Sequence, residues 1–169
     1  LTKIKDQIRE TENETKNPGR VKLIAVTKTR DFQTINKAYE CGVTSIGENR
    51  VQEAESKFES FQNMPDLEKR FIGHLQSNKV KRCLALFDTI DSVNSLKIAK
   101  KINNHLTQEN RKIKSLLEVN MSGDEQKQGF SPENIDDLIL AISLEPLGVE
   151  GLMTIGPVSR NEKETRKAF

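Results

Sequence analysis

Short apolar runs alternate with amphipathic stretches along this chain in a fairly regular order. A short, continuously apolar run is typical of a parallel strand that is buried on both faces. The pattern therefore predicts six strands, over residues 22–28, 43–48, 70–75, 86–92, 113–121 and 148–155. An opening helix over roughly residues 2–14 is expected before the first strand.

The stretches between the strands carry apolar residues at helical spacing, which predicts an outer layer of helices. Their apolar stripes are Phe32, Ile35, Ala38 and Tyr39; Val51, Ala54, Phe58 and Phe61; Val80, Cys83, Leu84 and Phe87; Ile98, Ala99, Ile102 and Leu106; and Ile135, Leu138, Ile139 and Ile142. Ser131 and Pro132 are expected to open the last of these helices, as N-cap and first-turn proline. Gly42 and Gly148 stand where a helix ends and a strand begins.

Alternating strands and helices imply a parallel sheet covered by helices, either an open doubly wound sheet or a closed (β/α)8 barrel. In both folds, functional residues collect beyond the carboxyl ends of the strands. Mostly polar residues stand at the ends of all six predicted strands, at Lys28, Asn49, His74, Asp91–Ser92, Asn120 with Ser122, and Met153–Thr154. An open sheet usually uses only a few strand ends for its site, so this distribution favours the barrel.

Chain length qualifies this prediction. A complete barrel of this type needs about 250 residues, whereas the opening helix and six βα units occupy all 169 residues here. We therefore predict a single domain over residues 1–169, a barrel truncated after six units and lacking the seventh and eighth strands. Its first and sixth strands would expose open edges. Such a chain on its own is expected to be poorly stable, aggregation-prone or completed by another copy.

Lys28 is the most reactive group that the pattern singles out, because it ends the apolar run Leu23–Val26. A lysine at the mouth of an apolar strand is expected to be poorly hydrated, which lowers the pKa of its ammonium group. A neutral amine is the form that condenses with an aldehyde or ketone to give an imine. Taken alone, Lys28 is better explained as a lysine whose charged head reaches water at a strand end, and the remaining strand ends shift this balance.

Composition limits the remaining function classes. A net charge of +2 with 31% charged residues describes a well-solvated chain and does not argue for a nucleic-acid or membrane partner. Cys41 and Cys83 lack metal-ligand spacing and fall at apolar helix positions, which predicts buried thiols and a reducing, cytoplasmic setting. With His105 on a polar helix, the two histidines give no metal-binding pattern.

Several segments resemble the pyridoxal phosphate homeostasis proteins, single-domain relatives of the alanine racemase N-terminal barrel. The segments are Ala25–Lys28, Ile46–Glu53, Phe71–Lys79, Asp91–Val93, Glu118–Asn120 and Gly151–Thr154. The resemblance runs in order from the first strand to Gly156. The Gly-Glu-Asn and Ile-Gly-His-Leu-Gln elements are specific in combination, although either one alone would be weak.

This resemblance implies that Lys28 holds pyridoxal 5′-phosphate as a Schiff base. It places Asn49, His74 and Ser122 beside the cofactor, and Met153 and Thr154 in the pocket lining. It also implies a role in vitamin B6 homeostasis, with buffering of the cofactor and its delivery to apoenzymes, and a monomer when the chain is complete. In the family, motifs on the seventh and eighth strands hold the cofactor phosphate and face the pyridine nitrogen. This sequence has no counterpart of those motifs.

Two alternatives remain. A racemase or decarboxylase of the same barrel class needs a second acid/base group near the cofactor, and the single tyrosine, Tyr39, is predicted on an outer helix. A Schiff-base aldolase without cofactor needs a carboxylate near Lys28. Glu48 is the candidate, and strand alternation points it away from the pocket if Asn49 points inward.

Overall fold

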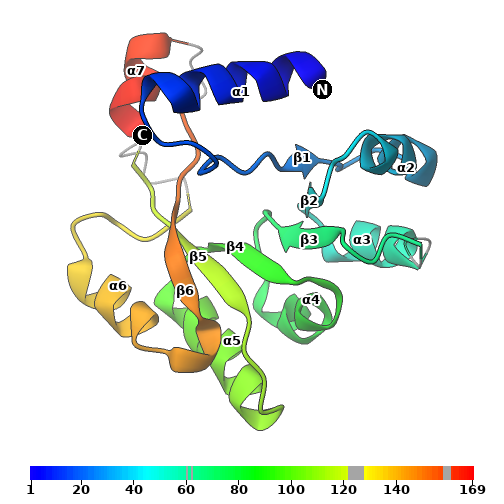
Figure 1. The fold of residues 1–169 in the computed structure, drawn as a ribbon. Coiled ribbons are helices and arrows are strands. Elements are labelled where there is room, and N and C mark those ends of the chain that lie inside the picture. Colours follow the sequence, from blue (N-terminus) through cyan, green and yellow to red (C-terminus); the bar gives the residue numbers. More distant parts are fainter. Residues whose placement is uncertain (60, 62, 122–127, 158–160) are drawn as a thin grey trace.

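Six parallel strands form one sheet in the computed structural model, which describes residues 1–59, 61, 63–121, 128–157 and 161–169. The strands lie side by side in chain order, so each βα unit adds one strand next to the preceding one (Figure 1). They are β1 (Ala25–Val26), β2 (Ser45–Glu48), β3 (Glu68–Phe71), β4 (Thr89–Val93), β5 (Lys114–Glu118) and β6 (Val149–Met153). The predicted number, order and parallel direction of the strands are confirmed.

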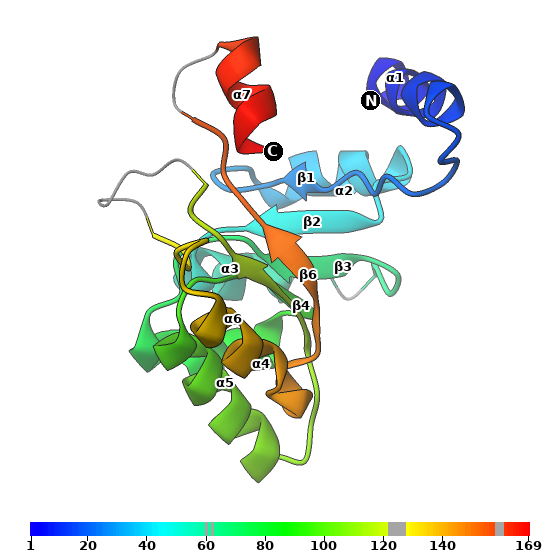
Figure 2. The ribbon, with the colours of Figure 1, turned by 90° about the vertical axis from the view of Figure 1, so that its left-hand side faces the viewer.

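Helices follow the strands as predicted, after an opening helix α1 (Thr2–Glu14). The others are α2 (Phe32–Glu40), α3 (Val51–Phe58), the 3₁₀ turn η1 (Ser77–Lys79), α4 (Val80–Leu86), α5 (Leu96–Gln108), α6 (Ile135–Ile142), the 3₁₀ turn η2 (Glu145–Leu147) and α7 (Glu162–Ala168). Figures 1 and 2 show α3, α4 and α5 together along one face of the sheet. The described helices are each too short or too polar to cross a bilayer.

The strands are shorter than their apolar runs. β1 has two residues where seven were predicted, because Leu23 and Ile24 stay outside the hydrogen-bonded ladder while remaining partly buried. β3 begins earlier than predicted, at the charged residue Glu68, whose backbone N–H donates to the carbonyl of Thr44. An apolar run marks what is buried, whereas a strand is defined by backbone pairing.

The outward face of the sheet supplies the apolar core. Ile46, Phe71, Ile90 and Leu117 point toward the helices and are at most 1% exposed. The predicted stripes of α4 and α5 pack against this face, and Cys83 is fully buried among them, which raises the pKa of its thiol. Cys41 is exposed, so its predicted burial is wrong: it follows the last turn of α2 and does not face the core.

The predictions for α6 need two corrections. The helix begins at Ile135, and the side chain of Asn134 caps it by accepting from the N–H of Asp137, so Ser131 and Pro132 precede the helix. Ile135, Ile139 and Ile142 were expected to face the core and are more than half exposed. The helix packs through Leu138 of the predicted stripe and through Ala141, so the other three stripe residues lie on the side turned away from the described core.

The inward face of the sheet carries a network of charged groups below the strand ends. Arg70 on β3 donates from Nε and one terminal nitrogen to the carboxylate of Asp91 on β4, at 2.7 and 3.0 Å. Its other terminal nitrogen donates to Glu68 at 2.9 Å. Glu68 also accepts from Ser45 on β2 and from the ammonium group of Lys22. This inner network joins three strands through charged hydrogen bonds, which are stronger than neutral ones.

The sheet is open. β1 pairs only with β2 and β6 only with β5 among the described residues, which leaves the expected edges at both margins. Apolar side chains lie at these margins: Val26 is 52% exposed, Leu152 is 64% and Ile155 is 62%. Figure 2 shows β1 and β6 as separate strands, and no strand among the described residues pairs with both.

Gly73→Ala should destabilise the fold. A Cβ at position 73 would lie 2.1 Å from the backbone oxygen of Asn49, a contact that only a backbone shift can relieve. We expect a loss of about 2 kcal/mol or more in the free energy of unfolding, measured in urea. Gly151→Ala is the matched control, because its Cβ would meet only a side-chain atom of Leu116, at 3.6 Å. Equal stabilities of the two variants would contradict the prediction.

Glu68→Gln should weaken the dependence of stability on acid pH. Burial acts to raise the pKa of Glu68, but hydrogen bonds from Lys22, Arg70 and Ser45 prevail and lower it from 4.5 to about 2. A carboxylate with a lowered pKa stabilises the fold above its ordinary value, and this contribution is lost as pH falls through the folded-state value. We expect a contribution on the order of 2 kcal/mol, lost between pH 4.5 and about 2. Denaturant titrations across that pH range would measure the contribution of Glu68 to the free energy of unfolding. If the unmodified chain and Glu68→Gln lost stability in the same way as the pH fell, the prediction would be refuted.

Candidate functional site at the carboxyl ends of the strands

A cavity of about 890 Å³ lies at the inner face of the sheet, where the strands end. It brings together four of the six predicted site residues: Lys28, Asn49, His74 and Met153. Apolar side chains complete much of its wall; they are Ile24, Val26, Ile72, Leu116, Val119 and Ile155. The volume is within the range of pockets that hold small-molecule ligands, and the mixture of an apolar wall with few polar groups is typical of them.

Lys28 follows β1 and reaches this cavity from a tight turn. The N–H of Arg30 donates to the carbonyl of Thr27 at 3.0 Å, which closes the turn around Lys28 and Thr29. Thr29 has a left-handed backbone, with φ of 63°. The side chain of Lys28 is exposed to solvent, so the expected desolvation of its amine is absent here. The physical reason is the open sheet, since β1 pairs only with β2 in the part of the chain that the structure describes.

Asn49 follows β2, and its place depends on β3. The N–H of Ile72 donates to the carbonyl of Glu48 at 2.9 Å, which extends the parallel pairing up to the cavity. Gly73 then passes so close to the backbone of Asn49 that only a hydrogen fits where a Cβ would be. The half-buried Asn49 is therefore held by backbone packing and lines the cavity beside His74.

His74 is oriented by a residue that the sequence analysis did not select. The side-chain amide of Asn94 lies 2.9 Å from Nδ1 of His74 and donates to Oε1 of Gln128 at 2.5 Å. Because an amide nitrogen only donates, Nδ1 of the ring accepts and its neutral form carries the proton on Nε2. Asn94 is buried after β4, one residue beyond the Asp91–Val93 segment, and only a spatial contact connects it to His74.

Thr154 and Ser122 have different outcomes. The hydroxyl of Thr154 donates to the carbonyl of Val119 at 2.9 Å, so it ties the end of β6 to the end of β5. Thr154 is not part of the cavity wall described above, although its neighbour Met153 is. Ser122 lies outside the described residues. A cofactor contact by either residue stays a prediction.

Two carboxyl groups on the inner face were not predicted to contact the cofactor, although Asp91 was placed at a strand end. Asp91 and Glu118 both line the cavity. Asp91 is paired with Arg70, whereas burial raises the pKa of Glu118. Glu48, the carboxylate weighed in the sequence analysis, lies on the opposite face of the sheet as strand alternation predicted, fully buried and bonded to Lys57. Strand alternation was therefore correct for Glu48. It also places Glu118 on the inward face, two residues along β5 from Leu116, which lines the same cavity.

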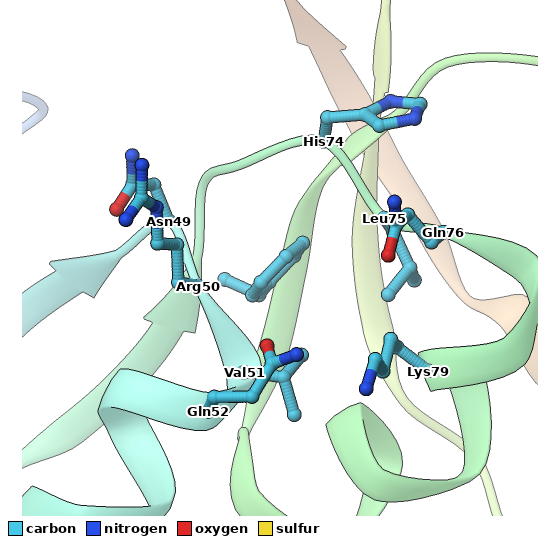
Figure 3. Close-up of a pocket in the computed structure, with 9 residues that line it drawn as sticks. Asn49, Arg50, Val51, Gln52, His74, Leu75, Gln76 and Lys79 are labelled. Atoms are coloured by element: carbon cyan, nitrogen blue, oxygen red, sulfur yellow. The ribbon is translucent and has the colours of Figure 1, made fainter.

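A second cavity, of about 610 Å³, adjoins the first and shares Asn49 and His74 with it. Figure 3 shows Arg50 and Asn49 beyond β2 on one side and Lys79 on the other, with Gln52 between them at the start of α3. The basic side chains make this cavity more polar than the first. In the described part of the chain, no cluster of three or more His, Cys, Asp or Glu residues is placed to hold a metal ion.

Comparison with known proteins places this geometry in a family. The family model described as "Alanine racemase, N-terminal domain" matches residues 1–169. The pyridoxal phosphate homeostasis protein of Aquifex aeolicus is 38% identical over 149 residues, 88% of this chain and 65% of that protein. That of Haemophilus influenzae is 37% identical over 158 residues, 92% of this chain and 67% of that protein. This chain therefore spans about two thirds of the length of these relatives.

Solved structures agree with this assignment. A crystal structure described as an unknown protein from Bifidobacterium adolescentis superposes with a TM-score of 0.91 at 34% identity, over 99% of this chain and 72% of that one. PipY of Synechococcus elongatus PCC7942, solved with PLP bound, superposes with a TM-score of 0.80 at 32% identity, over 94% of this chain and 74% of PipY. An alanine racemase of Clostridium difficile, at 21% identity and a TM-score of 0.72, shares the fold.

The six parallel βα units, the family match over the whole chain and the two homologous homeostasis proteins agree with one another. This chain belongs to the pyridoxal phosphate homeostasis protein family, built on the alanine racemase N-terminal barrel type of fold.

Proposed function

We propose that this chain binds pyridoxal 5′-phosphate through a Schiff base at Lys28 and acts in vitamin B6 homeostasis, buffering the cofactor and delivering it to apoenzymes. The observation that carries the proposal is the meeting of Lys28, Asn49, His74 and Met153 in one cavity. PipY, a relative with the same fold, has been solved with PLP bound. The proposal rests on this shared fold together with the residues that line the cavity.

The residues of the cavity fit an aromatic aldehyde. Lys28 supplies a primary amine, and condensation of an amine with an aldehyde forms a C=N bond and releases water. The apolar wall, with Val26, Ile72 and Leu116, offers a surface against which a flat ring can pack. Asn49 and His74 supply polar groups at the same rim, and Asn94 fixes the direction in which His74 donates. The bound cofactor would supply a reactive aldehyde that is held in reserve by this linkage.

The domain prediction stays a prediction. The described sheet has six strands, and exposed apolar residues lie at both margins and on α6, where Ile139 is 58% exposed. Two further βα units, as in a complete eight-unit barrel, would cover such margins. In that barrel fold the phosphate site is commonly built by the loops after strands 7 and 8, so we propose that this chain carries the amine end of the site.

The racemase and decarboxylase alternative has weaker support. Tyr39 lies on α2 and packs against the apolar cluster around Ile35 and Ile46, away from the cavity. Glu118 is the described carboxyl group that lines the cavity without an ion pair among the described residues. Racemisation requires proton transfer on both sides of the substrate carbon. Incubation with L- or D-alanine, followed by chiral analysis of the products, would distinguish a racemase from a homeostasis protein. Racemised product would favour the enzyme.

Lys28→Arg should abolish covalent capture of the cofactor. Arginine keeps the positive charge but does not lose its proton in proteins, so it forms no Schiff base. We expect borohydride reduction of the chain loaded with pyridoxal 5′-phosphate to label position 28, and the variant to lose that label and its visible absorbance. Lys81→Ala removes an exposed lysine on α4 and is the control. An unlabelled Lys28 in the unmodified chain would refute the proposed function.

His74→Ala should weaken cofactor binding without preventing capture. Loss of one hydrogen-bonding side chain at the rim is worth about 1 kcal/mol, which corresponds to a three- to tenfold higher dissociation constant. A titration followed by absorbance measures it. His105→Ala, which removes the other histidine from α5, should leave binding unchanged. An unchanged dissociation constant in His74→Ala would remove His74 from the site.

A further inference from the structure

Two side chains of α3 hold the backbone on both sides of Lys28. The ammonium group of Lys57 donates to the carbonyl of Thr27 at 2.9 Å. The carboxylate of Glu53 accepts from the N–H of Thr29 at 2.5 Å. Lys57 and Glu53 are one helical turn apart and bond to each other at 2.6 Å. The residues before and after Lys28 are therefore tied to one turn of a neighbouring helix.

Glu48 anchors this arrangement beneath the helix. Its Oε1 accepts from the ammonium group of Lys57 at 2.9 Å and from the hydroxyl of Thr27 at 2.7 Å. Glu48 is fully buried and the side chain of Lys57 is 11% exposed. An ammonium group has three donors, and those of Lys57 have three acceptors here, on Thr27, Glu48 and Glu53. Breaking a buried pair of this kind leaves an uncompensated charge.

The backbone that is held here needs external support. Thr29 is in the left-handed region with φ of 63°, which costs a residue with a side chain about 1 kcal/mol or more. β1 gives little support, because it has two residues and pairs on one side only among the described residues. A left-handed backbone at such a residue persists only when surrounding contacts hold it. The hydrogen bond from the N–H of Thr29 to Glu53 is one contact that stabilises this conformation.

The charges of the group reinforce one another. The pKa of Glu53 is lowered, first by its hydrogen bond with Lys57, although burial opposes this. Burial acts to lower the pKa of Lys57, but its hydrogen bonds to Glu53 and Glu48 prevail and raise it. The pair therefore stays ionised around neutral pH, and the hydrogen bonds to Thr27 and Thr29 keep their charged partners.

We infer that Glu48, Glu53 and Lys57 form a positioning clasp that fixes the turn carrying Lys28 and so directs its amine into the cavity. The inference rests on the proposed function of Lys28. A lysine side chain is long and flexible, so the place of its amine depends on a fixed backbone. None of the three clasp residues lines the cavity, so their effect on the amine acts through the turn.

Glu53→Ala tests the clasp while leaving the buried ion pair between Lys57 and Glu48 in place. We expect Schiff-base formation with pyridoxal 5′-phosphate, followed by absorbance and borohydride labelling of Lys28, to slow about tenfold, as for a loss of one charged hydrogen bond. Glu53→Gln keeps an acceptor for Thr29 and should recover part of the rate. Glu55→Ala is the matched control, since Glu55 lies on the same helix and pairs with Arg82 of α4 instead.

A second pair of variants separates positioning from stability. Lys57→Met should destabilise the fold, because it leaves the buried Glu48 without its cation. Adding Glu48→Gln removes that buried charge and should restore part of the melting temperature, while the rate of Lys28 labelling stays slow. A role in stability alone predicts instead that the labelling rate recovers together with the melting temperature, and that result would overturn the clasp.

The outcomes distinguish the clasp from the function on which it rests. If unmodified Lys28 is labelled and Glu53→Ala reacts as fast as Glu55→Ala, the clasp is wrong and the proposed function stands. If Lys28 of the unmodified chain is not labelled, the proposed function fails and the clasp fails with it. Slow labelling in Glu53→Ala, with a normal rate in Glu55→Ala, supports both.

Discussion

The parallel pairing of β2 with β1 and β3 is the constraint on which the candidate site depends. Parallel strands of adjacent βα units end at the same edge of a sheet, so Lys28, Asn49 and His74 meet although they are far apart in sequence. The pairing tolerates little change, because the backbone at Gly73 fills the space beside Asn49. The cavity is a consequence of this register.

Strand alternation gives the two faces of the sheet different charge networks. On the inner face, Arg70 connects Asp91 and Glu68 under the cavity. On the outer face, Lys57 neutralises Glu48 where apolar packing would otherwise be expected. Buried charges are tolerated when they are paired and hydrogen-bonded. We infer that this is why polar residues on both faces of β2 and β3 are compatible with a stable sheet.

The fold and the function have different kinds of support. Six parallel βα units and the family match establish the barrel type, which an alanine racemase shares, but a fold does not by itself determine a function. Function therefore depends on the side chains at the rim. Here these side chains are Lys28, the apolar wall and the Asn94–His74 pair.

The sequence by itself determined the six-strand order, the helical layer and the strand ends that carry Lys28, Asn49, His74 and Met153, because burial and period-two alternation are local patterns. Tertiary structure alone decided that Asn94 orients His74, that Lys57 and Glu53 hold the turn at Lys28, and that Ile135 and Ile139 of α6 are exposed. The physical reason is that these contacts join separate elements. A side chain's spacing along the chain tells which face of its own element it occupies, whereas its partner is determined by how that element packs against the others.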